Sequence, residues 1–395
     1  MLYNRTLRKM FASVALAAIA SPAFALDGAD LVAKLNAANS ASGLTVTYGN
    51  IAADGDTLTL QATKVTPTGG EALEIGDITL KGVGEDGDGG YTVETVSFPN
   101  INKTEGDTTI VASDIQLGGL TIPAKADGKT LDTMLFYQTA TTGPIMVTNK
   151  GKEVFSTSGI AGRVERRTND TGMDFDGSVS DIKADLTTIK DPKSKDTIEK
   201  LGLQTIEGKI DMKGSWELGS GLFSVDEYAF DFNDVGRLNL AFAISGYTLD
   251  FMNTMREAVE TAQANPNKEE ANNALGMSML GMLQQLTFNS AEISFNDASL
   301  TKKVLDVVGA EQGVSGDQMA QSLKGLVPLM IAQLNMPELQ NQISQAVNTY
   351  LDDPKSLKIT AAPANPVPFP MIMGAAMGAP NTIPQVLGVT VTANQ

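Results

Sequence analysis

Few side chains in this 395-residue sequence could take part in catalysis, because it contains no histidine and no cysteine. The absence of histidine excludes Ser-His-Asp and Cys-His nucleophile systems, histidine general bases and nearly all zinc sites. Carboxylates, Lys, Tyr, Ser and Thr remain, together with cations that are bound by oxygen atoms. The candidates must therefore be judged by the spacing of their carboxylates.

One acidic cluster could bind calcium through its side-chain oxygens: Asp86, Asp88 and Glu94. A calcium loop of twelve residues that began at Asp86 would end at Ser97, which is not a carboxylate. Asp-Gly steps are typical of hairpin turns. We therefore predict a hairpin turn and no metal site here, and likewise at residues 54–56.

Two pairs of neighbouring carboxylates could supply a general acid and a general base, as in glycosidases: Asp226 with Glu227, and Asp231 with Asp234. Adjacent residues of a strand point to opposite faces, so Asp226 and Glu227 would not face one substrate. Aromatic residues, which form platforms for sugars, make up only 6% of the chain. We predict solvated carboxylates, no catalytic residue, no cofactor and no enzymatic activity.

Methionines cluster in two segments: Met277, Met279 and Met282, and later Met371, Met373 and Met377. Methionine is flexible and polarizable, which suits both surfaces for varied apolar ligands and the filling of gaps in cores. Gly276 and Gly281 each weaken a helix by about 1 kcal/mol relative to Ala, which favours close packing or movement there. Core filling remains the alternative to a predicted surface for an apolar ligand or partner: Met277, Met279, Met282 and Leu283.

The first 25 residues predict export. Arg5, Arg8 and Lys9 precede the apolar run Met10–Ala20, and small residues follow up to Ala25. This order is typical of a secretory signal peptide with cleavage after Ala25. The apolar run is shorter than the roughly 20 residues that span a bilayer. We therefore predict a periplasmic protein without a stable membrane span after cleavage.

Charge and composition restrict the partners. The net charge is -17, and removal of the three basic residues of the first segment would make it about -20. This balance disfavours nucleic acid and anionic headgroups as broad-surface partners. Without cysteine there are no disulfides, so a hydrophobic core must stabilise the roughly 370 remaining residues.

Two hydrophobic periods divide the chain. From Gly43 onward apolar and polar residues alternate, as in strands with one buried face, and the clearest run is Leu238, Leu240, Phe242 and Ile244. A change of phase at Gly76-Asp77 predicts a bulge that keeps four residues on the core side: Leu73, Ile75, Ile78 and Leu80. Helical spacing occurs at Asp27–Asn39 and again after residue 250.

Two local signals concern the later helices. Ser315 with Gln318 has the pattern of a capping box, and Pro328 predicts a kink or the end of that helix. We predict an α+β, predominantly β fold, in which a long twisted antiparallel sheet forms a groove-like meander with C-terminal amphipathic helices packed on it. Three regions are expected: a signal peptide (1–25), a β-rich meander (26–200), and strands plus helices (201–395) continuous with the first sheet.

The second half carries a resemblance. Strands end in Asn-Asp or Asp steps before helices such as Ala298–Gly309, and the run Tyr350–Ile359 precedes the proline-rich segment Ala362–Phe369. This pattern resembles uncharacterised exported envelope proteins of Gram-negative bacteria and is distantly similar to the AsmA-like group. Members of that group are implicated in envelope lipid handling and usually carry a membrane anchor, which this chain would lose on cleavage.

These patterns lead to two expectations about function. The first is a non-enzymatic periplasmic envelope protein that binds lipid or another apolar ligand in a groove of the sheet. The alternative is a structural or assembly protein that binds another envelope protein through sheet edges or the Met-bearing helices.

Overall fold

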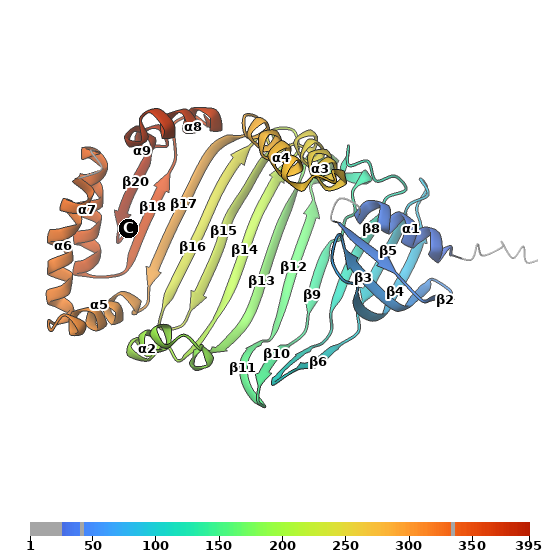
Figure 1. Cartoon of the computed structure of the whole chain (residues 1–395), viewed down its shortest axis with the longest axis horizontal. Coiled ribbons are helices and arrows are strands. Elements are labelled where there is room, and N and C mark those ends of the chain that lie inside the picture. The colour runs from blue at the N-terminus through green and yellow to red at the C-terminus, as the bar shows by residue number, and fades with distance from the viewer. Residues whose placement is uncertain (1–25, 40–42, 333–335) are drawn as a thin grey trace, which may run out of the picture.

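The computed structural model describes residues 26–39, 43–332 and 336–395. The predicted signal peptide and its cleavage site lie outside the described residues. Within the described part, all 20 strands belong to one antiparallel sheet, and most helices follow in the C-terminal half (Figure 1). The predicted α+β fold with a long antiparallel sheet is thereby confirmed.

The strands, in chain order, are β1 (Leu44–Thr47), β2 (Asn50–Asp54), β3 (Thr57–Pro67), β4 (Leu73–Glu85), β5 (Tyr91–Ser97), β6 (Ile101–Glu105), β7 (Thr108–Ala112), β8 (Gln116–Ile122), β9 (Thr139–Thr142), β10 (Ile145–Asn149), β11 (Lys152–Thr157), β12 (Gly159–Arg166), β13 (Gly172–Asp185), β14 (Thr205–Glu217), β15 (Leu222–Phe232), β16 (Gly236–Ser245), β17 (Thr287–Asp297), β18 (Ser356–Ala361), β19 (Val367–Pro368) and β20 (Val389–Ala393). The helices are α1 (Gly28–Asn39), α2 (Pro192–Leu201), α3 (Leu249–Ala264), α4 (Lys268–Leu283), α5 (Leu300–Glu311), α6 (Gly316–Ala332), α7 (Pro337–Asp352), α8 (Phe369–Gly378) and α9 (Ile383–Val386).

The sheet is a continuous series of antiparallel neighbours. From β3 it passes through β4, β5, β8, β9 and β12 to β13, and then through β14, β15, β16, β17 and β18 to β20. A second row, β6–β7–β10–β11, joins β13. Because β13 pairs with β14 along most of its length, strands from both halves of the chain share one sheet.

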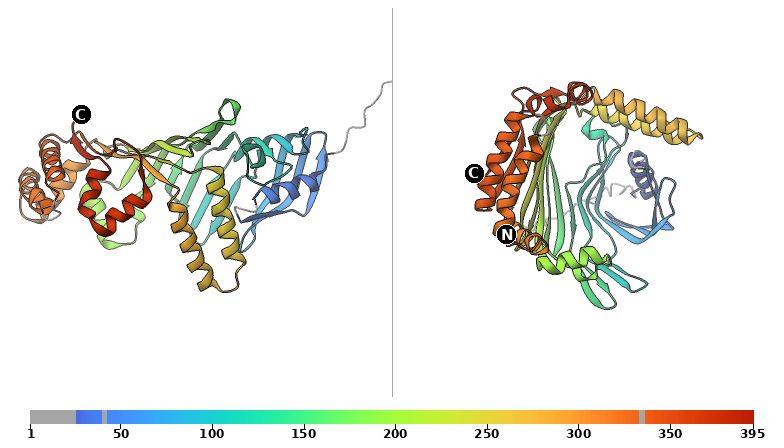
Figure 2. Two further views of the ribbon diagram at one scale, coloured as in Figure 1. Left: turned by 90° about the horizontal axis from the view of Figure 1, so that it is seen from above. Right: turned by 60° about the vertical axis from the view of Figure 1, so that its left-hand side comes forward.

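Helix α1 forms the main core with the N-terminal strands, which curve around it (Figure 2). Leu31 is fully buried, and it packs in one cluster with Leu58, Leu80 and Val93 from three strands. Asp27 begins the helix, since its carboxylate accepts hydrogen bonds from the backbone N–H groups of residues 29 and 30. This N-terminal part of the sheet therefore has a covered apolar face.

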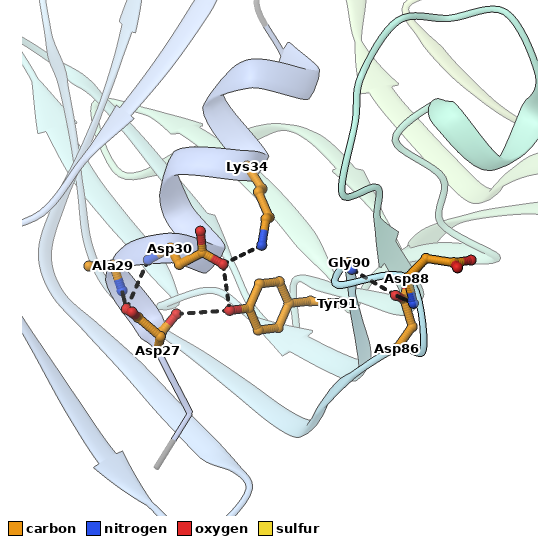
Figure 3. A network of polar contacts seen from close by, with 8 residues as sticks. All are labelled: Asp27, Ala29, Asp30, Lys34, Asp86, Asp88, Gly90 and Tyr91. Carbon is orange, nitrogen blue, oxygen red and sulfur yellow. Dashed lines mark hydrogen bonds and ion pairs between the residues drawn. The ribbon is translucent and has the colours of Figure 1, made fainter. Parts of the chain in front are cut away.

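A polar network fixes α1 to β5 (Figure 3). The Tyr91 hydroxyl donates to Asp30 Oδ2 at 2.8 Å and lies 3.4 Å from the carbonyl oxygen of Asp27. Lys34 pairs with Asp30 and also lies 5.1 Å from the centroid of the Tyr91 ring. The hydrogen bonds from Lys34 and then Tyr91 lower the pKa of Asp30, whereas burial and the bond to Asp30 raise the pKa of Tyr91.

Amide side chains of helices bind backbone groups on two edge strands of the sheet, β1 and β20. Asn36 of α1 donates to the carbonyl of Val46 at 2.8 Å and accepts from its N–H at 2.7 Å, on β1. Likewise, the N–H of Val391 on β20 donates to Gln342 of α7 at 3.3 Å. These contacts occupy backbone groups that would otherwise be free to pair with another strand.

The later helices stand at the margins of the sheet (Figures 1 and 2). Helix α7 runs beside β20, and the α3–α4 hairpin stands away from the sheet on a small core of Phe251, Met282 and Leu286. The predicted capping box is confirmed, since Ser315 and Gln318 exchange hydrogen bonds at 2.9 and 3.2 Å. Helix α6 does not end at Pro328 but continues to Ala332.

Candidate functional site on the apolar face of the sheet

Strand register gives the sheet from β12 to β18 one apolar face. Residues that oppose each other on neighbouring strands lie on the same side, and Leu240 opposes Ile293, which in turn opposes Ile359. The same rule, followed from strand to strand, defines the apolar face by these side chains: Ile160, Val164, Phe175, Val179, Ile182, Ile206, Ile210, Met212, Trp216, Phe223, Val225, Tyr228, Phe230, Leu238, Leu240, Phe242, Ile244, Phe288, Ile293, Phe295, Leu357 and Ile359.

The apolar face continues beneath α1. Gly162 opposes Ala140, Ala140 opposes Leu117, and Leu117 opposes Val96, which is buried in the α1 core. Helix α1 therefore covers the N-terminal end of the same face that is apolar farther along the sheet. The described helices near β13–β16, namely α2, α3 and α4, lie at the ends of these strands, and none of the described helices crosses the middle of the strands (Figures 1 and 2).

Exposure follows this division. Beneath α1 the core side chains are almost fully buried, as Leu58 and Leu80 show at 0% and 2% exposure. On the apolar face between β12 and β18, six side chains are between 37% and 50% exposed: Ile160, Met212, Tyr228, Phe242, Ile293 and Ile359. Exposed apolar side chains on neighbouring strands make this part of the face a candidate site for a ligand or partner.

An aromatic cluster forms one end of the apolar face. The Phe175 and Phe223 rings stack at 5.6 Å, and Phe223 also contacts Phe242 and Tyr247 at 6.1 and 5.8 Å. Trp216 donates from Nε1 to the Tyr247 carbonyl at 2.7 Å, which satisfies its buried polar group. With the Trp216 donor already bonded, these packed rings present a largely apolar surface.

A glycine permits this stacking. Gly214 lies on β14 between Phe175 of β13 and Val225 of β15. A Cβ at this position would collide with the Phe175 ring and with the backbone oxygen of Ser224. The ring of Phe175 can therefore lie over the β14 backbone and reach Phe223 only because residue 214 has no side chain.

The opposite face of the same strands is polar. Arg237 lies 2.6 Å from Glu227, 3.4 Å from Asp231 and 4.0 Å from Asp211, and these four residues come from three neighbouring strands. Lys183 is paired with Glu207 at 2.9 Å, which raises the pKa of Lys183. Charged side chains that form such ion pairs are typical of a surface in contact with water, so we expect this face to be solvated.

A cavity of about 590 Å³ lies among charged side chains that include Asp181, Lys183, Glu207 and Lys209. Hydrogen bonding to Asp211 raises the pKa of Lys209. Within the described residues, no group of three or more carboxylates is placed to hold a metal ion. Lys183 and Lys209 in its lining are paired with Glu207 and Asp211, so these charges are already engaged with one another.

The predicted turn at Asp86 is formed by its own backbone and side chain. The Asp86 carboxylate accepts from the N–H groups of Asp88 and Gly90 at 3.0 and 2.7 Å (Figure 3). Its oxygen is thus occupied by a tight turn between β4 and β5.

Glu227, one of the proposed acid–base candidates, is an ion-pair partner of Arg237.

The predicted Met-bearing surface is divided by the fold. Met277 and Met279 of α4 are 71% and 43% exposed, but Met282 is 4% exposed in the small core at the base of the hairpin. Leu283 is partly buried and packs against the same core. Helical spacing in the sequence predicted these four residues as one surface, but the sequence analysis did not identify the strand residues of the apolar face as a site. The available signal for those strand residues was the alternation of apolar and polar residues, repeated over successive strands.

Comparison with known proteins gives partial matches. A family model described as an uncharacterized protein matches residues 229–394, from within β15 to β20. Large ribosomal subunit protein uL24 of Mycoplasma capricolum and of Mycoplasma mycoides are each 37% identical over 71 residues, or 17% of this chain. The chain spans 64% of the length of these curated relatives.

Among the described residues, no helix combines the length and hydrophobicity needed to cross a membrane.

Proposed function

We propose that this chain is a non-enzymatic periplasmic protein of the cell envelope that binds lipid or another apolar ligand on the apolar face. The observation that carries the proposal is the exposed set of apolar side chains between β12 and β18, on a face that α1 covers farther along the sheet. A folded protein ordinarily buries such a face against another layer. A ligand with acyl chains would supply that layer.

The energetics favour a long apolar ligand. Each methylene group removed from water contributes about 0.8 kcal/mol, so on the order of ten methylenes would exceed several kcal/mol of association cost. The side chains that would receive them extend over seven strands, from β12 to β18. A chain-like ligand matches this extended shape better than a compact polar one.

Two features of the sequence support the periplasmic location and the class of ligand. The first 25 residues have the pattern of a secretory signal peptide. The distant similarity to AsmA-like proteins, which are implicated in envelope lipid handling, supports the same class of ligand. The match to ribosomal protein uL24 does not support an RNA-binding role, because a net charge of -17 disfavours binding to a polyanion.

The single tryptophan makes the proposal testable. Trp216 belongs to the aromatic cluster of the apolar face, so brominated acyl chains that lie there should quench its fluorescence. The probe is a brominated monoacylglycerol, an uncharged lipid with one chain. Ile293→Lys places a charge at the most exposed residue of the face, at 50% exposure. It should weaken the apparent affinity by about tenfold or more, since burying an ammonium against an acyl chain is costly.

The matched control places the same charge on the other side of the sheet. Ala241 of β16 opposes Glu292 on the polar face, so Ala241→Lys should leave quenching unchanged. Lipid extracted from protein purified out of the periplasm should be detectable by mass spectrometry. Absence of bound lipid together with absence of quenching would contradict the proposal, as would equal loss of quenching in both variants.

A second candidate function is the binding of another envelope protein. The exposed side chains of α4 favour it, namely Met277, Met279 and Leu280. A photocrosslinker at position 277 that captures a protein in cells, with no lipid found on the purified chain, would favour this function over the first.

A further inference from the structure

A second cavity lies away from the middle of the apolar face. It has about 520 Å³ and is bounded by the end of α1, the segment 126–137 and one side of α3. Its walls are mainly apolar, and Leu135, Met252, Met255 and Val259 contribute to them. This volume falls within the range of small-molecule sites, about 300–1,000 Å³.

Two side chains of α3 hold the facing segment in place. Asn253 donates to the carbonyl of Gly128 at 3.0 Å, and Arg256 donates to the carbonyl of Asp127 at 3.2 Å. Gly128 has φ +66°, and a Cβ there would lie 2.7 Å from the Asn253 side chain. The cavity wall is therefore a close and specific contact between segments more than 100 residues apart in the sequence.

Among the described residues that line this apolar cavity, one is a cation, Arg256. Arg256 is 27% exposed in its side chain, and its nearest acidic partner is Glu260, at 3.9 Å. A guanidinium carries five N–H donors in a planar fork that suits the two oxygens of a carboxylate. The bond to the Asp127 carbonyl and the long contact with Glu260 leave donor capacity toward the cavity.

We propose that this cavity binds a single-chain lipid anion, with its carboxylate on Arg256 and its acyl chain among the apolar walls. At roughly 30 Å³ for each water-sized group, the cavity holds on the order of 17 such groups, close to the number of heavy atoms in palmitate. The proposal adds a second site, selective for head-group charge, to the proposed function. A cation at one end of an apolar cavity is the feature that would distinguish a lipid anion from an uncharged lipid.

Displacement of a bound fluorescent fatty acid tests the proposal. Palmitate and hexadecanol have the same chain length and differ in charge. The native chain should bind palmitate at least about tenfold more tightly than hexadecanol, because a charge-assisted bond forms only with the carboxylate. Arg256→Gln should bring the ratio of the two affinities close to one. Lys268→Gln removes an exposed cation of the same hairpin and should leave the ratio unchanged.

The ratio separates recognition of charge from a structural effect. A variant that merely loosened segment 126–137 would weaken both ligands equally and keep the ratio, and that result would overturn the role of Arg256. A native ratio of one would do the same. If Ile293→Lys removes palmitate binding while Arg256→Gln does not, the lipid lies on the apolar face alone and the cavity proposal fails. The reverse pattern would support the cavity, and quenching of Trp216 by the uncharged brominated monoacylglycerol separately tests binding on the apolar face.

Discussion

The Tyr91→Phe substitution isolates one hydroxyl in the contact that holds α1 over the apolar face. Phenylalanine keeps the buried ring, which is 3% exposed, and removes only the donor to Asp30 at 2.8 Å. A hydrogen bond contributes about 0.5–1.5 kcal/mol to stability. Because the acceptor reaches solvent and keeps Lys34 as a partner, we expect a loss of about 1 kcal/mol at neutral pH, or roughly 1–2 °C in the melting temperature of a chain of this length.

The same substitution has a predicted dependence on pH. Burial and the Asp30 carboxylate raise the pKa of Tyr91 in the folded chain above its ordinary value of 10.0. The unfolded chain loses this proton from about pH 10 upward while the folded chain keeps it, so stability from Tyr91 is present below pH 10 and declines above it. Phenylalanine has no such proton, so the stability difference between the two proteins should shrink above pH 10.

Urea unfolding at several pH values between 7 and 12 measures both effects. Tyr228→Phe is the matched control, because it removes a hydroxyl from a ring that is 38% exposed, and it should change stability by less than about 0.5 kcal/mol. Equal stability of the native chain and Tyr91→Phe at pH 7 would refute the role of this hydrogen bond. A difference that stays constant up to pH 12 would refute the raised pKa.

Two further predictions concern other contacts of the sheet. Hydrogen bonds from Lys152 and Thr187 lower the pKa of Asp185 to about 2, so its stabilising effect is present above about pH 4 and lost as the pH falls through 2. In thermal unfolding, the melting temperature of Asp185→Asn should be lower than that of the native chain at pH 5, and this difference should vanish near pH 2. A difference that does not change with pH would argue against the lowered pKa of Asp185. Asn36→Ala removes both hydrogen bonds to Val46 and should lower the free energy of unfolding in urea by about 1–3 kcal/mol. Because the edge of β1 is then free to pair with another chain, light scattering should increase. An unchanged urea midpoint would count against the capping role of Asn36.

Signals confined to a few neighbouring residues were predictable from the sequence. The capping box at Ser315 depends on residues three positions apart, and both of its hydrogen bonds are present. The alternation from Leu238 to Ile244 likewise predicted β16. The bulge near Gly76 is also present, with a shifted register and φ +98° at the glycine.

Predictions that depended on the extent of the core were less successful. Ile78 and Leu80 are buried as expected, but Leu73 is 57% exposed, so its predicted place in the core is wrong. The bulge sets which way a side chain points, whereas burial requires another element above it. The same limit applies to α4, where helical spacing alone could not show that Met282 would be buried and Met277 exposed.

The sequence by itself determined the two hydrophobic periods, the strongly acidic balance and the lack of histidine and cysteine chemistry. These features depend on residue type and on spacing over a few positions, because strands and helices repeat over two and 3.6 residues. Only the tertiary structure decided which part of the apolar face is covered and which cation lines a cavity. Those outcomes depend on contacts such as Tyr91 with Asp30 and Arg256 with Asp127, which join segments 61 and 129 residues apart. Local periodicity makes a face apolar, but only chain topology determines what lies against it.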